Sequence, residues 1–356
     1  MMEKRSQLKI LYINNYACDI SYYKEIKNFD FGANHYWGVY EMLQRGNHVE
    51  FLPSDKAPAM KGKKNFIKKL ILSLKRKIYR KRVLNKYRDF DIIYSAMTGS
   101  MQMNYYSRLK EKGKMKAKLI AVLHHPVNTL KYPSAYHKIL FLSKGVETGF
   151  TYPHKEYLFW GPDLSYYDYW INKLQKNREM KDIIFISNGK SHRNHDEFLY
   201  VADKLQVKAI VTCDNTTLPE KKYLNNKNFN ILYPNNSKRA ITSNENIELV
   251  LSADVMVIPV RTDNIHLCGL TSFVDAIALG KPVIMSDNTF IDIDIEKEGF
   301  GFIYKAGDVL DLEAKMNVFL ENKFLALEMG KRAREFAQKM NFKDVWAKRL
   351  LEIIEE

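Results

Sequence analysis

The feature that most constrains the fold of this chain is the alternation of short apolar, β-branched runs with longer amphipathic stretches. This alternation is typical of α/β folds, in which helices cover both faces of a parallel sheet. A turn at 156–170, containing Gly161-Pro162, separates two groups of runs, so we expect two doubly wound, Rossmann-like domains facing each other across a cleft. The predicted strands lie at 8–14, 47–53, 90–96 and 118–125, and at 181–187, 207–213, 228–234, 254–260 and 281–287.

The length of 356 residues also favours two domains. We expect an N-terminal domain over 1–163, a C-terminal domain over 164–340, and a final helix over 341–356 that packs back on the N-terminal domain. The three cysteines are too widely spaced for a disulfide framework or a zinc knuckle. Without a secretory signal or an apolar run of roughly 20 residues, the sequence predicts a cytoplasmic protein.

The positive charge, +15 in all, is concentrated in one segment. Residues 61–88 hold thirteen Lys or Arg and no acidic residue. Apolar residues recur there at helical spacing, which predicts a basic amphipathic helix over 64–88. Such helices bind anionic membrane surfaces, although a solvated helix packed on its own domain fits the pattern as well. Nucleic acid is a poor partner, because the segment lacks interleaved Gly and aromatic residues. The apolar residues are Ile67, Leu70, Ile71, Leu74 and Ile78.

The stretch CGLTSFVDAIALGKPVIMSD (268–287) contains the clearest indication of function. Small and hydroxyl residues stand at a predicted helix start, where free N–H groups and the helix dipole favour an anion. A Gly-Lys-Pro break then leads into the next predicted strand. The segment therefore predicts a phosphate-binding site.

Residues 254–287 resemble the nucleotide-sugar site of GT-B glycosyltransferases, especially family 4 and its bacterial surface-polysaccharide relatives. FISNGKSHRNHDEF (185–198) is similar to the second donor-binding element of that family, a strand followed by two cations. The resemblance covers most of residues 8–340 and implies a GT-B fold, with a nucleoside-diphosphate sugar bound in the cleft.

The resemblance also implies roles for individual residues. Asp275 stands where the family places a Glu that binds the ribose. We expect no metal requirement, because no Asp-x-Asp motif marks the predicted diphosphate site. In an alternative interpretation these residues are only helix caps and surface charges. The residues implied for the diphosphate are Lys190, Arg193, Gly269, Leu270, Thr271 and Ser272.

The departure at Leu267 bears on the mechanism, because retaining members of the family carry a Glu there. We therefore favour an inverting transfer, with His266 contacting the sugar. Inversion needs a base for the acceptor hydroxyl, and the candidates are His124, His125 and His35, each of which could equally be structural. A metal site built from His192, His195 and Asp196 is disfavoured.

These features predict a glycosyltransferase that acts on a glycan or lipid-linked acceptor in bacterial surface-polysaccharide or glycolipid synthesis. The basic helix would hold it at the inner face of the cytoplasmic membrane. A GT-B nucleotide-sugar 2-epimerase is an alternative, although its carboxylate-rich site is not evident. A non-catalytic, basic membrane-binding protein with a degenerate site is another.

Overall fold

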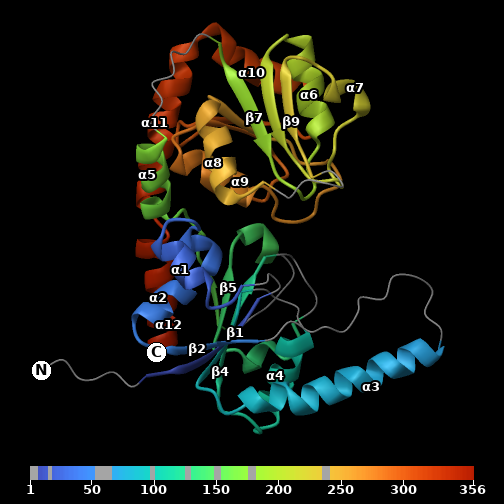
Figure 1. Ribbon diagram of the computed structural model, residues 1–356, viewed down its shortest axis with the longest axis vertical. Coiled ribbons are helices and arrows are strands. Elements are labelled where there is room, and N and C mark those ends of the chain that lie inside the picture. The colour runs from blue at the N-terminus through green and yellow to red at the C-terminus, as the bar shows by residue number, and fades with distance from the viewer. Residues whose placement is uncertain are drawn as a thin grey trace, which may run out of the picture.

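The computed structural model shows two α/β halves stacked along the long axis of the molecule (Figure 1). It describes residues 7–14, 18–52, 66–96, 101–124, 130–147, 154–174, 182–234 and 241–356. Each half contains a six-stranded sheet in which all paired strands are parallel. The predicted architecture of two doubly wound parallel sheets is therefore confirmed.

The N-terminal sheet has the strand order β2-β1-β3-β4-β5-β6, and the C-terminal sheet the order β12-β11-β10-β7-β8-β9. All nine predicted strands are present. The strands of the N-terminal sheet are β1 (Lys9–Ile13), β2 (His48–Phe51), β3 (Ile92–Ser95), β4 (Lys118–Leu123), β5 (Lys138–Phe141) and β6 (Lys155–Tyr157). Those of the C-terminal sheet are β7 (Ile184–Asn188), β8 (Lys208–Thr212), β9 (Phe229–Leu232), β10 (Val255–Ile258), β11 (Val283–Ser286) and β12 (Gly301–Tyr304).

Sequence analysis missed β5, β6 and β12. Each has only three or four residues, and β6 and β12 lie at the edges of their sheets. Runs this short carry little periodicity of their own, and their pairing with β4, β5 and β11 makes them strands.

The sheets are buried on both faces, as the continuous apolar strand sequences require. In β1, Ile10 and Tyr12 pack into one core cluster, whereas Leu11 and Ile13 pack into another on the opposite face. This alternation follows from the two-residue period of a strand. The helices of the described residues are α1 (Tyr22–Lys27), α2 (Val39–Gln44), α3 (Phe66–Arg82), α4 (Met101–Glu111), α5 (Leu164–Lys173), α6 (His195–Lys204), α7 (Lys221–Leu224), α8 (Ser243–Ser252), α9 (Leu270–Ala278), α10 (Val309–Glu321), α11 (Lys323–Lys339) and α12 (Lys348–Glu355).

The predicted helix over 64–88 is too long at its C-terminal end. Helix α3 ends at Arg82, and a 3-10 turn follows at Leu84–Tyr87. Leu84 and Tyr87 are buried in the N-terminal core, so the chain must turn inward there. Residues 61–65 lie outside the described part of the chain. None of the described helices is long and apolar enough to cross a membrane.

The apolar stripe of α3 faces solvent. Its side chains are 46–68% exposed, and Figure 1 shows the helix extending away from the N-terminal sheet. An exposed stripe of this kind is unusual for a helix that belongs only to its own domain. The residues of the stripe are Ile67, Leu70, Ile71, Leu74 and Ile78.

The chain passes between the two halves twice, and the two passages touch. A Cβ atom on Gly161 would lie 1.7 Å from the carbonyl oxygen of Met340, and Phe342 N–H donates to Pro162 O at 2.8 Å. Beyond this crossing a π-helical turn and α12 lie beside the N-terminal half (Figure 1). Arg349 makes a two-pronged ion pair with Glu156 of β6 at 2.6 and 2.9 Å.

Candidate functional site

A cleft of about 760 Å³ lies between the two halves, at the loops that follow their strands. This is where parallel α/β sheets bind ligands. Every predicted site residue within the described ranges lines it: His35, His124, Lys190, Arg193, His266, Gly269, Leu270, Thr271, Ser272 and Asp275. His125 lies outside the described part of the chain.

Helix α9 opens into the cleft without a side-chain cap. Helices α6, α8 and α10 are capped by Asn194, Thr242 and Asp308, whereas the N-cap of α9 is Gly269, with φ of +89° and no capping hydrogen bond among the described residues. A Cβ atom at Gly269 would lie 2.6 Å from Ile258 of β10, so only Gly fits. The N–H groups of the first turn of α9 therefore remain available to an anion.

Arg193 lies directly beside this helix start. Its strand-like pairing with Val260 turns the side chain inward, where it is 7% exposed. The guanidinium donates to the carbonyl oxygens of Asn188 and Ser191, each at 3.1 Å, and to the hydroxyl of Ser272 at 3.0 Å. Burial lowers the Arg193 pKa to about 10, so the side chain stays charged at pH 7.

No acidic side chain among the described residues forms a salt bridge with Arg193. Buried charges are normally paired, because moving a charge out of water without a counter-charge costs free energy. A buried cation beside an uncapped helix start therefore indicates a binding site for an anionic ligand.

Ser272 serves this site indirectly. Its hydroxyl donates to the Asn188 carbonyl oxygen at 2.9 Å and accepts from Arg193. The side chain is 3% exposed, so it orients Arg193, and only its backbone N–H is available to a ligand. Leu270 can likewise offer only its N–H, whereas Thr271 is exposed at the cleft.

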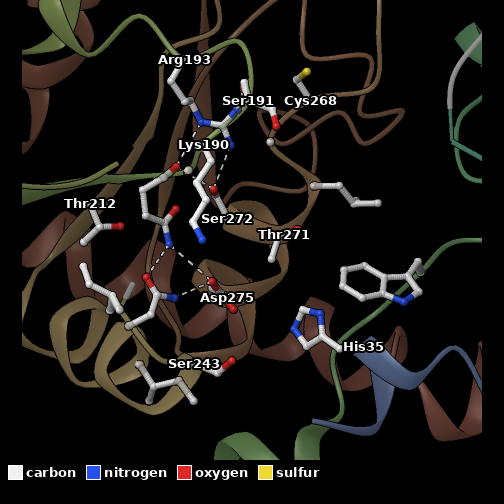
Figure 2. Close-up of a pocket in the computed structure, with 18 of the residues that line it drawn as sticks. His35, Lys190, Ser191, Arg193, Thr212, Ser243, Cys268, Thr271, Ser272 and Asp275 are labelled. Carbon is white, nitrogen blue, oxygen red and sulfur yellow. Dashed lines mark hydrogen bonds between the residues drawn. The ribbon is translucent and has the colours of Figure 1, made fainter. Parts of the chain in front are cut away.

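Lys190 follows Gly189, whose φ of +131° allows the chain to turn tightly beside Arg193. A Cβ atom at Gly189 would lie 2.7 Å from the Arg193 guanidinium. The Lys190 side chain is exposed and extends into the cleft (Figure 2). The two cations thus differ: Arg193 is fixed, and Lys190 is able to move onto a ligand.

Asp275 is held in a buried network that draws on three other elements. Its carboxylate accepts from the hydroxyl of Tyr167 at 2.6 Å. It also accepts from the side-chain amides of Asn246 and Asn188, at 2.9 and 3.4 Å (Figure 2). Burial raises the Asp275 pKa to about 6, against the opposing effect of these hydrogen bonds. Sequence analysis missed the three partners, because each contacts Asp275 only through the tertiary fold.

His35 and His124 lie in an aromatic wall of the N-terminal half. His35 contacts Trp160 edge-on at 5.2 Å, and burial lowers its pKa to about 4, so it is neutral at pH 7. His124 packs on Trp37 at 4.7 Å, and its Nε2 donates to the Ala96 carbonyl oxygen at 2.5 Å. The only carboxylate among the described residues lining the cleft is Asp275.

His266 lies on the C-terminal side, with its ring 5.7 Å from that of His192. His195 is buried instead, within hydrogen-bonding distance of Ser187 Oγ and the Gly189 carbonyl oxygen. No cluster of three metal-ligating side chains occurs among the described residues. Leu267, the neighbour of His266 in the sequence, also lines the cleft.

The sequence does contain two Asp-x-Asp pairs, at 89–91 and 292–294. Neither contributes to the cleft. Asp91 accepts from Lys9 N–H at 2.8 Å, Asp294 accepts from Lys297 N–H at 3.0 Å, and Asp292 accepts from Lys144 N–H. These three carboxylates therefore bind backbone N–H groups outside the cleft.

Comparison with known proteins agrees with this fold. Residues 168–338 match the family of glycosyl transferases group 1. Solved structures with the same fold include Anabaena HepE in complex with UDP and glucose, with 14% identity, a TM-score of 0.59, and coverage of 98% of this chain and 100% of that one. Sucrose-phosphate synthase from Thermosynechococcus elongatus aligns at 13% identity and a TM-score of 0.62, covering 98% of both chains.

WaaG, a glycosyltransferase involved in lipopolysaccharide biosynthesis, aligns at 12% identity and a TM-score of 0.57, covering 97% of this chain and 99% of that one. No curated protein matches the sequence. Residues 168–338 thus match glycosyl transferases group 1, and the chain as a whole has the fold of the GT-B glycosyltransferases.

Proposed function

We propose that this enzyme transfers a sugar from a nucleoside-diphosphate sugar to a glycan or lipid-linked acceptor in the synthesis of a surface polysaccharide or glycolipid. The observation that carries the proposal is Arg193, a buried cation that lies at the uncapped start of α9. In this proposal the diphosphate binds to that helix start, to Arg193 and to Lys190, and the ribose binds near Asp275. HepE, solved with UDP and with UDP-glucose, supports a UDP-sugar as donor.

The proposed reaction needs no metal. Negative charge grows on the departing diphosphate in the transition state, and fixed positive groups lower the barrier most where that charge appears. Arg193, Lys190 and the N–H groups of α9 supply three such groups without any ion.

We further propose inversion at the anomeric carbon. Leu267 removes the carboxylate of retaining relatives, and His35 or His124 lies on the opposite side of the cleft, where an acceptor hydroxyl would need a base. A neutral imidazole can accept that proton. NMR of the anomeric proton in the product, made from a donor of known configuration, tests this step, and a retained configuration would contradict it.

We also propose that the enzyme docks on the inner face of the cytoplasmic membrane. The exposed stripe of α3 supports it, together with the Lys and Arg residues around that stripe. Apolar residues flanked by cations suit an anionic lipid surface. The involvement of WaaG in lipopolysaccharide biosynthesis supports a membrane-borne acceptor.

The direct test is the release of UDP from UDP-sugars in membranes that contain candidate lipid-linked acceptors. We expect release only when donor and acceptor are both present, with an unchanged rate in EDTA. Release from the donor alone would contradict transfer. Abolition by EDTA, with rescue by Mg²⁺ or Mn²⁺, would contradict the metal-independent mechanism.

A further inference from the structure

We propose that Asn188 is a donor-binding residue whose side-chain oxygen accepts a hydrogen bond from a ribose hydroxyl, beside Asp275. This inference rests on the proposed nucleotide-sugar donor. It adds a second acceptor to a subsite for which the sequence suggested only one residue.

The evidence is an acceptor that the protein leaves unused. Asn188 ends β7, lines the cleft and is only 5% exposed. Its Nδ2 donates to Asn246 Oδ1 at 3.1 Å and to Asp275 Oδ2 at 3.4 Å. Its Oδ1 is buried and has no hydrogen-bond partner among the described residues. Buried polar atoms are nearly always paired, so a bound ligand is expected to supply the hydrogen bond that this oxygen lacks.

The orientation of the amide follows from its neighbours. Rotating the amide by half a turn would place Oδ1 against the oxygens of Asn246 and Asp275, acceptor against acceptor. The arrangement with Nδ2 facing those oxygens is therefore the stable one, and it leaves Oδ1 as the atom for the ligand.

The chemistry of the ligand follows from the same atom. An acceptor needs a donor, and the diphosphate carries no N–H and almost no O–H at pH 7, so the phosphates cannot satisfy Oδ1. Yet the backbone of Asn188 adjoins the diphosphate site, because its carbonyl oxygen accepts from Arg193 at 3.1 Å and from Ser272 at 2.9 Å. In a nucleoside diphosphate, the hydroxyl-bearing group next to the phosphates is the ribose.

Asp275 provides the other acceptor. An ionised carboxylate offers about four acceptor positions, and three donors occupy those of Asp275. One position therefore remains, on Oδ1, the oxygen that accepts from Tyr167. Two neighbouring acceptors match the two neighbouring hydroxyls of a ribose. A site built around a hydroxyl rejects analogues that lack it, because its buried groups are then left unpaired.

The test is titration calorimetry with UDP, 2′-deoxy-UDP and 3′-deoxy-UDP. For the wild-type enzyme we expect at least one deoxynucleotide to bind about tenfold more weakly than UDP. Asn188→Leu keeps the shape of the side chain but loses the acceptor. In this variant UDP should bind about tenfold more weakly, and the deoxynucleotides should bind less than about threefold more weakly than UDP. Tyr167→Phe is the matched control, since it also removes a donor to Asp275 but leaves Asn188 and both partners of its amide nitrogen in place, and it should keep the discrimination.

Wild-type discrimination in Asn188→Leu would overturn the inference, and so would equal binding of all three nucleotides by the wild type. Asn188→Ala replaces the leucine variant if thermal melts show that the latter does not fold. Failure of the wild type to bind any of UDP, GDP or ADP would instead contradict the proposed function, so the two failures are distinguishable.

Discussion

At the scale of single residues, Lys190 and Arg193 allow the sharpest test of the donor site. A hydrogen bond between a charged group and phosphate contributes roughly 1.5–3 kcal/mol. We therefore expect Lys190→Ala and Arg193→Ala each to weaken UDP binding about tenfold or more, measured by calorimetry. Because Lys190 is exposed, Lys190→Ala should leave the thermal stability of the free enzyme unchanged.

Lys208→Ala is the control for these variants, since Lys208 is 57% exposed and does not line the cleft. It should bind UDP like the wild type. Unchanged affinity in both Lys190→Ala and Arg193→Ala would show that the diphosphate binds elsewhere.

Asp275 makes the stability of the folded protein depend on pH. Its pKa of about 6 lies above the ordinary value of 3.8, so the folded state binds its proton more tightly than the unfolded state does. Its burial therefore costs stability above pH 6, and the cost disappears as the pH falls below about 4. The variant Asp275→Asn carries no such cost, and Tyr167 can accept from the new amide.

We expect the difference in unfolding free energy, Asp275→Asn minus wild type, to fall by about 2.5 kcal/mol between pH 7.5 and pH 4. Urea denaturation at both pH values measures it, and taking the difference cancels the other titrating groups. A difference that does not change with pH would contradict the effect of burial. UDP binding should weaken in this variant, since the ribose loses a charged acceptor.

At the scale of elements, the Gly-Lys-Pro turn after α9 has a structural role. Gly280 ends the helix with φ of +63°, and Lys281 donates to the Leu251 and Ala253 carbonyl oxygens at the end of α8, at 3.2 and 2.6 Å. Helix α11 packs closely on this turn: a Cβ atom on Gly330 would lie 2.2 Å from the Gly280 carbonyl oxygen. The position of α9, and so of its N–H groups, depends on this contact.

Gly330→Ala tests that dependence. Helix propensity alone would make the variant about 1 kcal/mol more stable, but a clash with backbone typically costs 1–3 kcal/mol. We expect a net loss of about 1–2 kcal/mol in urea denaturation, with weaker UDP binding as α9 shifts. A stabilised variant would show that the two helices are free to separate.

At the scale of the whole molecule, the proposed docking on a membrane depends on α3. Each Lys or Arg near an anionic surface contributes about 1 kcal/mol, and the exposed stripe adds apolar insertion. We expect the enzyme to pellet with vesicles rich in phosphatidylglycerol and to remain partly bound in high salt. Replacing the exposed stripe by Ser should remove the salt-resistant fraction, because only electrostatic attraction is then left.

Replacing Lys69, Lys75, Arg76, Lys77, Lys81 and Arg82 by Gln should reduce pelleting to the salt-resistant fraction and slow transfer to a lipid-linked acceptor. UDP affinity should stay unchanged in both variants, since α3 does not line the cleft. If the Gln variant pellets like the wild type, membrane docking through α3 is wrong.

The sequence by itself determined the two parallel sheets and the start of α9. Apolar runs mark the strands because strands covered on both faces must be apolar throughout, and Gly269 marks a helix start because no other residue fits its backbone. Both are local signals. The length of α3 was misjudged, because its end depends on Leu84 and Tyr87 reaching a core that a helical pattern does not reveal.

Only the tertiary structure decided what surrounds each predicted residue. Arg193 and Lys190 are both cations in the same short segment of the sequence, but the structure separates them. Arg193 is buried, with no carboxylate in salt-bridge range among the described residues, whereas Lys190 is exposed. Tyr167 reaches Asp275 across 108 positions of the chain, and the unused oxygen of Asn188 exists only because Asn246 and Asp275 occupy its amide nitrogen. Burial and hydrogen-bond pairing are long-range properties, so they emerge when the elements pack together.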